Sequence, residues 1–271
     1  MQFHAFHYTT LKRMHKNPTA VKDARQTLGH IDYYISLSVF MYDFNLRGYN
    51  QRLCIPEILP DSELNIRGKN IRHPLIPEEK CVGNDFQLHR ENPVVLLTGS
   101  NMSGKSTFLR TLALNYILAN MGCGVFADSF QFSRMSLLCS IRINDSLKES
   151  ISLFYQEVLK LKYILDTIEK QKPCLVLIDE MLKGTNTKER RIASEAIIKY
   201  LSKSMALSVI ATHDLELTEV RTRSALKNYH FRESITGDKM FFDYKMHEGV
   251  LKTSNALKIL QLSGINIDFI H

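Results

Sequence analysis

The chain has 271 residues, 44% hydrophobic and 23% charged, a balance typical of globular proteins that excludes a disordered chain. Its net charge of +7 favours an anionic partner only weakly, because the 35 basic residues are dispersed. The five cysteines form no C-x-x-C pair, which indicates neither a zinc site nor a disulfide framework. Apolar runs such as Val94–Leu97 are far shorter than the roughly 18–20 residues that cross a membrane. We expect a cytoplasmic chain that makes no membrane contact.

The N-terminal part of the chain predicts a short helical lead-in over residues 1–45. Apolar residues recur there at near-helical spacing from Leu28 to Phe40, although a proline and a glycine interrupt the pattern. Residues 46–93 contain five of the seven prolines and predict a lobe of short strands and loops. We expect a domain boundary near residue 46.

Residues 94–271 alternate short apolar runs with helical patterns. This order predicts an α/β fold, with a mostly parallel sheet flanked by helices. Strands are expected at 93–99, 140–144, 174–179 and 207–212, with a strand or hairpin over 228–246. Helices are expected at 106–121, 150–171, 188–204 and 253–263.

The strongest functional motif follows the first of these strands. Gly99-Ser-Asn-Met-Ser-Gly-Lys-Ser106 fits G-x-x-x-x-G-K-[ST], the P-loop. Its glycines let backbone N–H groups turn toward a phosphate, and the following helix directs its positive end at the same anion. We expect Lys105 to reach the β- and γ-phosphates and Ser106 to bind Mg²⁺. The strand–loop–helix context disfavours the alternative, a glycine turn with a chance lysine. The predicted nucleotide-binding residues are Gly99, Ser100, Asn101, Met102, Ser103, Gly104, Lys105, Ser106 and Thr107.

Two further apolar runs end in polar residues that suit ATP hydrolysis. CLVLIDE ends in Asp179 and Glu180, at the carboxyl end of a strand, where open α/β sheets bind ligands. We expect Asp179 to bind Mg²⁺ and Glu180 to act as the general base on water. SVIATH ends in His213, which could sense or orient the γ-phosphate. Taken singly, the first is often a plain strand end and the second a surface histidine.

The ordered motifs together resemble the ABC-type ATPase domain of the MutS family of DNA mismatch-repair proteins, over about residues 70–265. The family's T-G-P-N-M-G-G-K-S-T appears as TGSNMSGKST, its Walker B stretch as LVLIDEMLKGTNT, and its A-T-H-[YF]-x-E-L as ATHDLEL. Upstream, RHP and VGND resemble the family's R-H-P and F-[VI]-x-N-D elements. The resemblance implies ATP and Mg²⁺ as cofactors and places Val82 and Asn84 against the adenine.

The resemblance also implies a homodimer with ATP sandwiched at its interface. The family's D-x-L-x-x-x-x-S-T-F-x-x-E appears as DSLKESISLFYQE, which makes Ser152 the candidate for a catalytic serine acting in trans on the partner's nucleotide. A plain helix N-cap is the alternative role of Ser152. The chain departs from the family at Ser100, Ser103 and Leu153, and at Leu182-Lys183 in place of Gly-Arg. These changes could slow turnover or alter subunit coupling.

A mismatch-reading domain with its Phe-x-Glu wedge does not precede the ATPase motifs. Phe231-Arg-Glu233 has the same letters but falls after them, and we interpret it as part of a strand. We therefore expect DNA contact through domains outside this chain. The favoured function is Mg-ATP hydrolysis that drives dimer-based switching in DNA mismatch repair or processing. The alternatives are a nucleotide-binding module with little turnover, and a related ATPase that acts away from mismatches with a membrane or other protein partner.

Overall fold

The computed structural model describes residues 17–46, 53–60, 62–100, 102–141, 150–170, 172–222, 226–236 and 239–251. It divides into two units, Met1–Asn50 and Gln51–His271. The described part of the first unit is one helix, α2 (Pro18–Leu46), which confirms the helical prediction for that stretch. Proline suits the first position of a helix, and Gly29 lies in the middle of α2 without ending it. No helix in the described ranges is both long and apolar enough to span a membrane.

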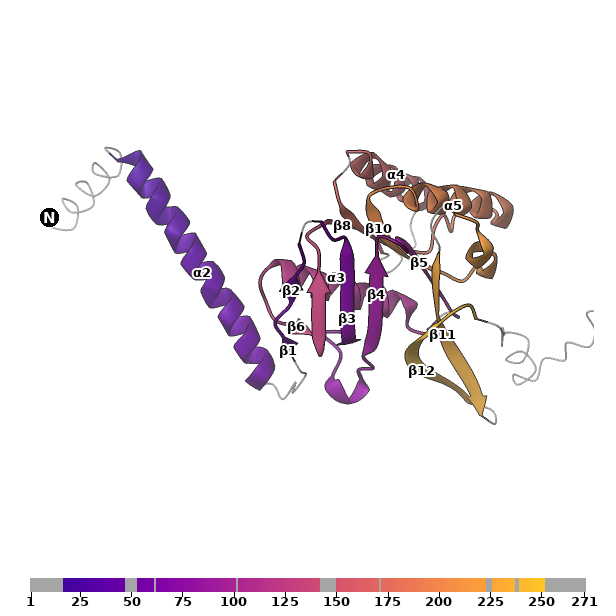
Figure 1. Ribbon diagram of the computed structural model, residues 1–271, viewed down its shortest axis with the longest axis horizontal. Coiled ribbons are helices and arrows are strands. Elements are labelled where there is room, and N and C mark those ends of the chain that lie inside the picture. The colour runs from indigo at the N-terminus through magenta and orange to yellow at the C-terminus, as the bar shows by residue number, and fades with distance from the viewer. Residues whose placement is uncertain are drawn as a thin grey trace, which may run out of the picture. The chain divides into compact units, whose positions relative to one another are not determined.

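The second unit is built on a six-stranded sheet in the order β12-β11-β5-β10-β9-β8 (Figure 1). The pairs among β11, β5, β10, β9 and β8 are parallel, and β12 runs antiparallel to β11. This arrangement confirms the α/β fold with a mostly parallel sheet. The strands are β5 (Val94–Thr98), β8 (Ser136–Ser140), β9 (Cys174–Asp179), β10 (Ala206–Thr212), β11 (Lys227–Thr236) and β12 (Lys239–Glu248).

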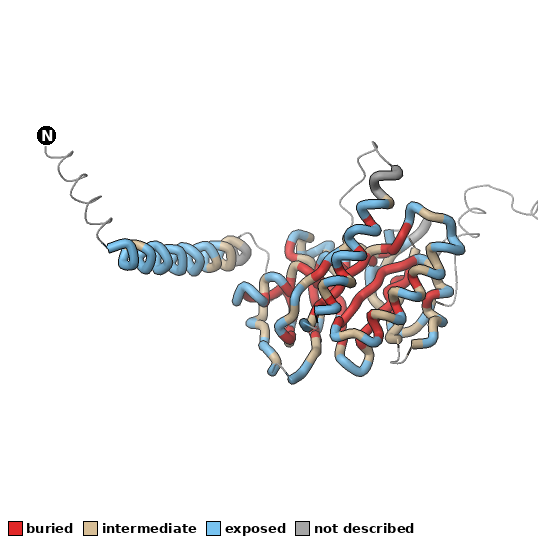
Figure 2. The backbone as a smooth tube through the Cα atoms, turned by 90° about the horizontal axis from the view of Figure 1, so that it is seen from above, coloured by how far each residue is buried: buried red, intermediate tan, exposed pale blue. Residues whose placement is uncertain are grey.

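Helices cover both faces of this sheet, and its strands β5 and β10 are buried from end to end (Figure 2). Alternate residues of β5 enter different hydrophobic clusters, as the pleat requires. Val95 and Leu97 pack in the cluster that contains α3 (Lys105–Asn120). Val94 and Leu96 pack in the cluster that contains residues of α4 (Ser150–Ile168) and α5 (Thr187–Leu201). The two-sided burial explains why β5 is a continuous apolar run rather than an alternating one.

A smaller sheet has the strand order β2-β7-β3-β4, and β1 pairs with β6 beside it. Residues 46–93 supply four of these short strands, and the last two come from the segment after α3. These last two strands were not predicted from the sequence, because runs of two and four residues carry little periodicity. The bounds are β1 (Leu53–Cys54), β2 (Glu57–Ile58), β3 (Asn65–Ile71), β4 (Asn84–His89), β6 (Val125–Phe126) and β7 (Ser129–Phe132), with 3-10 turns η1 (Glu78–Lys80) and η2 (Leu215–Glu219).

The other strand and helix predictions that fall on described residues hold with one correction. The strand expected at 140–144 starts too late: β8 spans Ser136–Ser140, because Leu138 pairs with Val176 of β9 and is buried, and residues 142–144 lie outside the described residues. The helices expected at 106–121, 150–171 and 188–204 are α3, α4 and α5, and the hairpin over 228–246 is β11–β12. The helix expected at 253–263 lies outside the described residues.

Candidate functional site

The loop between β5 and α3 turns sharply around two glycines. Gly99 and Gly104 have φ of 146° and 114°, in the region that disfavours side chains. A Cβ on Gly99 would stand 2.7 Å from Oγ of Ser103 and 2.8 Å from the carbonyl oxygen of Phe231. Only glycine therefore fits where the loop leaves the strand. Asn101 lies outside the described residues, and Met102 is exposed, with a φ of 72°.

Lys105 is buried at the first residue of α3, with 5% of its surface exposed. Its Nζ donates hydrogen bonds of 2.7 Å to the carbonyl oxygens of both Gly99 and Ser100. Burial lowers the Lys105 pKa to about 8, and the nearby carboxylate of Asp179 acts against that shift. The ammonium group is thus placed inside the loop, next to the positive end of α3. Ser106 is half-buried and Thr107 exposed in the same first turn.

The other two motifs lie at the ends of neighbouring strands. Asp179 ends β9 and Glu180 follows it, and the backbone N–H of Glu180 donates to the carbonyl oxygen of Ala211 in β10 at 2.9 Å. The carboxylate of Glu180 is 8% exposed, forms an ion pair with Lys183, and has its Oε1 3.4 Å from Nδ1 of His213. The structure therefore brings Glu180 and His213 together, as their positions after adjacent strands required.

The electrostatics of this cluster are set by its cations. The His213 pKa is lowered first by burial and then by the positive charges of Arg190, Lys105 and Lys183. A lowered pKa leaves the imidazole neutral at pH 7, so its ring can donate one hydrogen bond and accept another. Lys183, a departure from the family pattern, neutralises the buried carboxylate of Glu180.

The loop after Glu180 is fastened to helix α4. Leu182 has a φ of 55°, a strained conformation for a leucine, and its N–H donates to Oε1 of Glu157 at 2.7 Å. A Cβ on Gly184 would stand only 2.8 Å from Cβ of Phe154, so helix and loop are in close contact. Glu157 is the last residue of the DSLKESISLFYQE motif, and the motif alone predicts no role for it. Ser152 falls in the first turn of α4, and its side chain lies outside the described residues.

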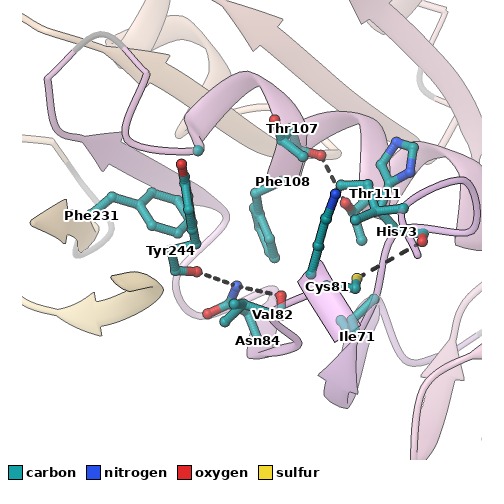
Figure 3. Close-up of a pocket in the computed structure, with 13 residues that line it drawn as sticks. Ile71, His73, Cys81, Val82, Asn84, Thr107, Phe108, Thr111, Phe231 and Tyr244 are labelled. Carbon is teal, nitrogen blue, oxygen red and sulfur yellow. Dashed lines mark hydrogen bonds between the residues drawn. The ribbon is translucent and has the colours of Figure 1, made fainter. Parts of the chain in front are cut away.

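A pocket of about 150 Å³ opens beside the P-loop (Figure 3). Gly104 and Thr107 border it on the loop side, and Val82 and Asn84 on the side of the smaller sheet. Phe108, Phe231 and Tyr244 line it with aromatic rings. The structure thus places Val82 and Asn84 in one pocket with the loop, and their contact with an adenine stays a prediction.

Asn84 fixes one wall of that pocket to the β11–β12 hairpin. Its Nδ2 donates to the carbonyl oxygen of Tyr244 at 3.0 Å, and its Oδ1 accepts from the N–H of Met246 at 2.7 Å. Tyr244 was not predicted from the sequence, where its position in an aromatic-rich hairpin is the only signal for it. Among the described residues no group of three or more His, Cys, Asp or Glu side chains could hold a metal ion by itself.

Comparison with known proteins points to the same family as the sequence motifs. Residues 95–271 match the family model of MutS domain V. The chain is 31% identical over 243 residues to the DNA mismatch repair protein MutS of Aquifex pyrophilus, covering 88% of this chain and 27% of that protein. It is 32% identical over 244 residues to MutS of Orientia tsutsugamushi (strain Ikeda), covering 87% of this chain and 26% of that protein. The chain spans about a quarter of the length of these relatives. With the P-loop ATPase fold and the family match, this chain belongs to the MutS domain V family.

Proposed function

We propose that this chain binds Mg-ATP and hydrolyses it. The observation that carries the proposal is the convergence of Lys105 with the adjacent pair Asp179 and Glu180, which come from two distant parts of the sequence. The loop holding Lys105 follows β5, and the acidic pair follows β9, with β10 lying between these strands. Asp179 is close enough to Lys105 to act on its charge. A buried ammonium, a helix N-terminus and two carboxylates at one sheet edge suit a triphosphate with its cation.

The pocket beside the loop is the proposed site of the adenine. Tyr244, Phe231 and Phe108 give it an aromatic lining, and Asn84 contributes an amide close to the same space. Purine rings bind well to such walls, because they pack against aromatic faces while polar groups at their edge find hydrogen bonds. Gly104 and Thr107 border this pocket, so an adenine bound in it would lie next to phosphates bound at the loop.

The residues at the sheet edge fit a magnesium ion bound with the nucleotide. The Ser106 hydroxyl and the Asp179 carboxylate are hard oxygen donors, which Mg²⁺ prefers, and phosphate oxygens and waters complete such sites. When bound, the ion would neutralise charge on the phosphates. Holding it would fall to Ser106 and Asp179, while Lys105 would contact the terminal phosphates.

Glu180 is the proposed general base. Oε2 of its buried carboxylate forms an ion pair with Lys183, and His213 lies next to Oε1. These two neighbours fix the orientation of the carboxylate. A carboxylate held in this way can take the proton of an attacking water when a nucleotide lies in the loop. The neutral His213 is then positioned to orient that water or the terminal phosphate.

Because the chain belongs to the MutS domain V family, we also propose that it works as a homodimer. A homodimer would sandwich ATP at its interface, with Ser152 of one chain acting on the nucleotide of the other. The two relatives are named DNA mismatch repair proteins, which supports a place for this chain in DNA mismatch repair or processing. Contact with DNA would fall to regions beyond the ATPase unit.

The test is binding and turnover of Mg-ATP by the full chain and a Lys105→Ala variant. Removing the ammonium should weaken binding of a fluorescent ATP analogue more than tenfold, because a charge-assisted contact to phosphate is lost. Lys203→Ala, which removes an exposed lysine after α5, is the matched control and should behave as wild type. Equal binding by all three proteins, or none by wild type, would reject the proposal.

A further inference from the structure

Glu233 on strand β11 is joined to the P-loop. The Ser100 hydroxyl donates a hydrogen bond to Oε2 of Glu233. The sequence had singled out Glu233 only as the end of a Phe-x-Glu triplet, and the structure places it in β11, which confirms the strand interpretation. Ser100 is the second residue of the loop and one of the departures from the family pattern. A carboxylate bound to a loop that is proposed to receive phosphates requires an explanation.

Contacts with β11 extend over three consecutive residues, from Thr98 at the end of β5 to Ser100 in the loop. Oγ1 of Thr98 donates to the carbonyl oxygen of Tyr229 at 3.3 Å. Gly99 approaches so closely that a Cβ would lie 2.8 Å from the carbonyl oxygen of Phe231. Ser100 then binds the side chain of Glu233. Alternate residues of β11 (Tyr229, Phe231 and Glu233) thus contact the successive residues Thr98, Gly99 and Ser100. These contacts continue beyond the last pair of the parallel ladder, His230 with Thr98.

Ser100 also holds the lysine of the loop. Its carbonyl oxygen accepts from Nζ of Lys105 at 2.7 Å and from Oγ of Ser103 at 2.8 Å. A group that fixes Ser100 therefore fixes the position of the Lys105 ammonium as well. Glu233 is also near enough for its charge to favour the protonated form of Lys105, which raises the pKa of that lysine against the effect of burial.

We propose that Glu233 is a positioning residue that latches the P-loop through Ser100 and lowers the affinity of the loop for nucleotide phosphates. This inference rests on the proposed binding of ATP at the loop. Two physical effects explain why this contact should lower, and not raise, the affinity for phosphates. The carboxylate repels the phosphates that approach Lys105, and it stabilises a loop in which the lysine is satisfied by carbonyl oxygens instead of a ligand. Nucleotide binding must overcome both.

Glu233→Gln tests the latch, because it keeps the shape of the side chain and removes its charge. The dissociation constant of a fluorescent ATP analogue with Mg²⁺ should fall about 3- to 10-fold, as expected for one partly screened charge near the phosphates. Glu248→Gln is the matched control: it removes a carboxylate from the same hairpin, one that pairs with Lys227 at 3.3 Å. That control should bind as wild type.

If Glu233 had only a structural role, Glu233→Gln would change the nucleotide affinity in the opposite direction. Loss of a structural contact would weaken nucleotide binding and lower the melting temperature, whereas release of a latch tightens binding. Ser100→Ala provides a second variant, since it breaks the hydrogen bond and leaves the charge. It should tighten binding by about twofold, in line with a modest net hydrogen-bond contribution, and less than Glu233→Gln does.

The outcomes separate the two proposals. Lys105-dependent binding by wild type together with unchanged or weaker binding by Glu233→Gln would overturn the latch and leave nucleotide binding intact. Absence of any binding by wild type would reject both. Tighter binding by Glu233→Gln, with Glu248→Gln unchanged, supports the latch.

Discussion

The backbone N–H of Leu182 donates a 2.7 Å hydrogen bond to Oε1 of Glu157, and this bond joins the loop after Glu180 to helix α4. Glu157 is 8% exposed and Leu182 7%, so both partners of the bond are shielded from water. Glu180 and Leu182 both have a φ of 55°, a conformation that costs roughly 1–2 kcal/mol per residue. Glu157 therefore stabilises a strained loop that holds the proposed general base.

Glu157→Ala should lower kcat more than tenfold while KM changes by less than about twofold. The variant leaves the buried N–H of Leu182 without its partner, at a cost of roughly 1–3 kcal/mol, and the loop can relax away from the geometry that directs Glu180. Glu157→Gln keeps an acceptor oxygen and should retain more activity. Steady-state ATPase assays measure both constants. A rise in KM at unchanged kcat would contradict this role.

Gly184→Ala should destabilise the ATPase unit by about 1–3 kcal/mol, the usual cost of overpacking. The added Cβ would lie 2.8 Å from Cβ of Phe154, so α4 or the loop must shift. Gly29→Ala is the control, because nothing lies within 4 Å of its added Cβ and the residue belongs to α2. Denaturant unfolding of both variants measures the difference. Equal midpoints would show that the contact between Phe154 and Gly184 is loose.

Nucleotide affinity should fall as pH rises above about 8. The nucleotide-free Lys105 pKa lies at about 8, and bound phosphates favour the ammonium form, so the lysine in the complex keeps its proton to higher pH. Above pH 8 binding must then take up a proton, and the dissociation constant rises by up to about tenfold per pH unit. Titrations between pH 7.5 and 9.5, with proton uptake from calorimetry in two buffers, test this. A constant affinity to pH 9.5 would contradict it.

Two inactive variants should restore activity when they are mixed. If Ser152 acts on the partner's nucleotide, a dimer of one Lys105→Ala chain and one Ser152→Ala chain contains one intact site and one doubly defective site. Random pairing makes half of the dimers mixed, so about a quarter of wild-type activity should return. Each variant alone provides the baseline. A mixture no more active than that baseline would argue that each site is completed within one chain.

The sequence predicted the parts of the site that lie in continuous motifs. Lys105, Glu180 and His213 each follow an apolar run, and the parallel order of β5, β10 and β9 brings such positions to one edge of the sheet. Contacts that depend on tertiary packing were not predictable in the same way. The bond from Ser100 to Glu233 joins residues 133 positions apart, and no local pattern records it.

The backbone conformation of Leu182 could not be predicted from the sequence either. The sequence showed that a leucine replaces the family's glycine, but not that it adopts the left-handed conformation that glycine favours. Burial of its side chain and the bond to Glu157 offset that strain, and both arise only when α4 packs against the loop. The short strands β6 and β7 were missed for a related reason, because pairing partners rather than periodicity define them.

Single-turnover hydrolysis by Glu180→Gln tests most directly whether this site hydrolyses ATP with Glu180 as the base. The variant keeps the loop, Lys105 and the pocket and loses one negative charge, so it should bind the fluorescent ATP analogue at least as tightly as wild type does. Its hydrolysis rate should fall by about 10²- to 10⁴-fold, the usual contribution of a general base. Hydrolysis at the wild-type rate by a variant that binds ATP normally would contradict the account.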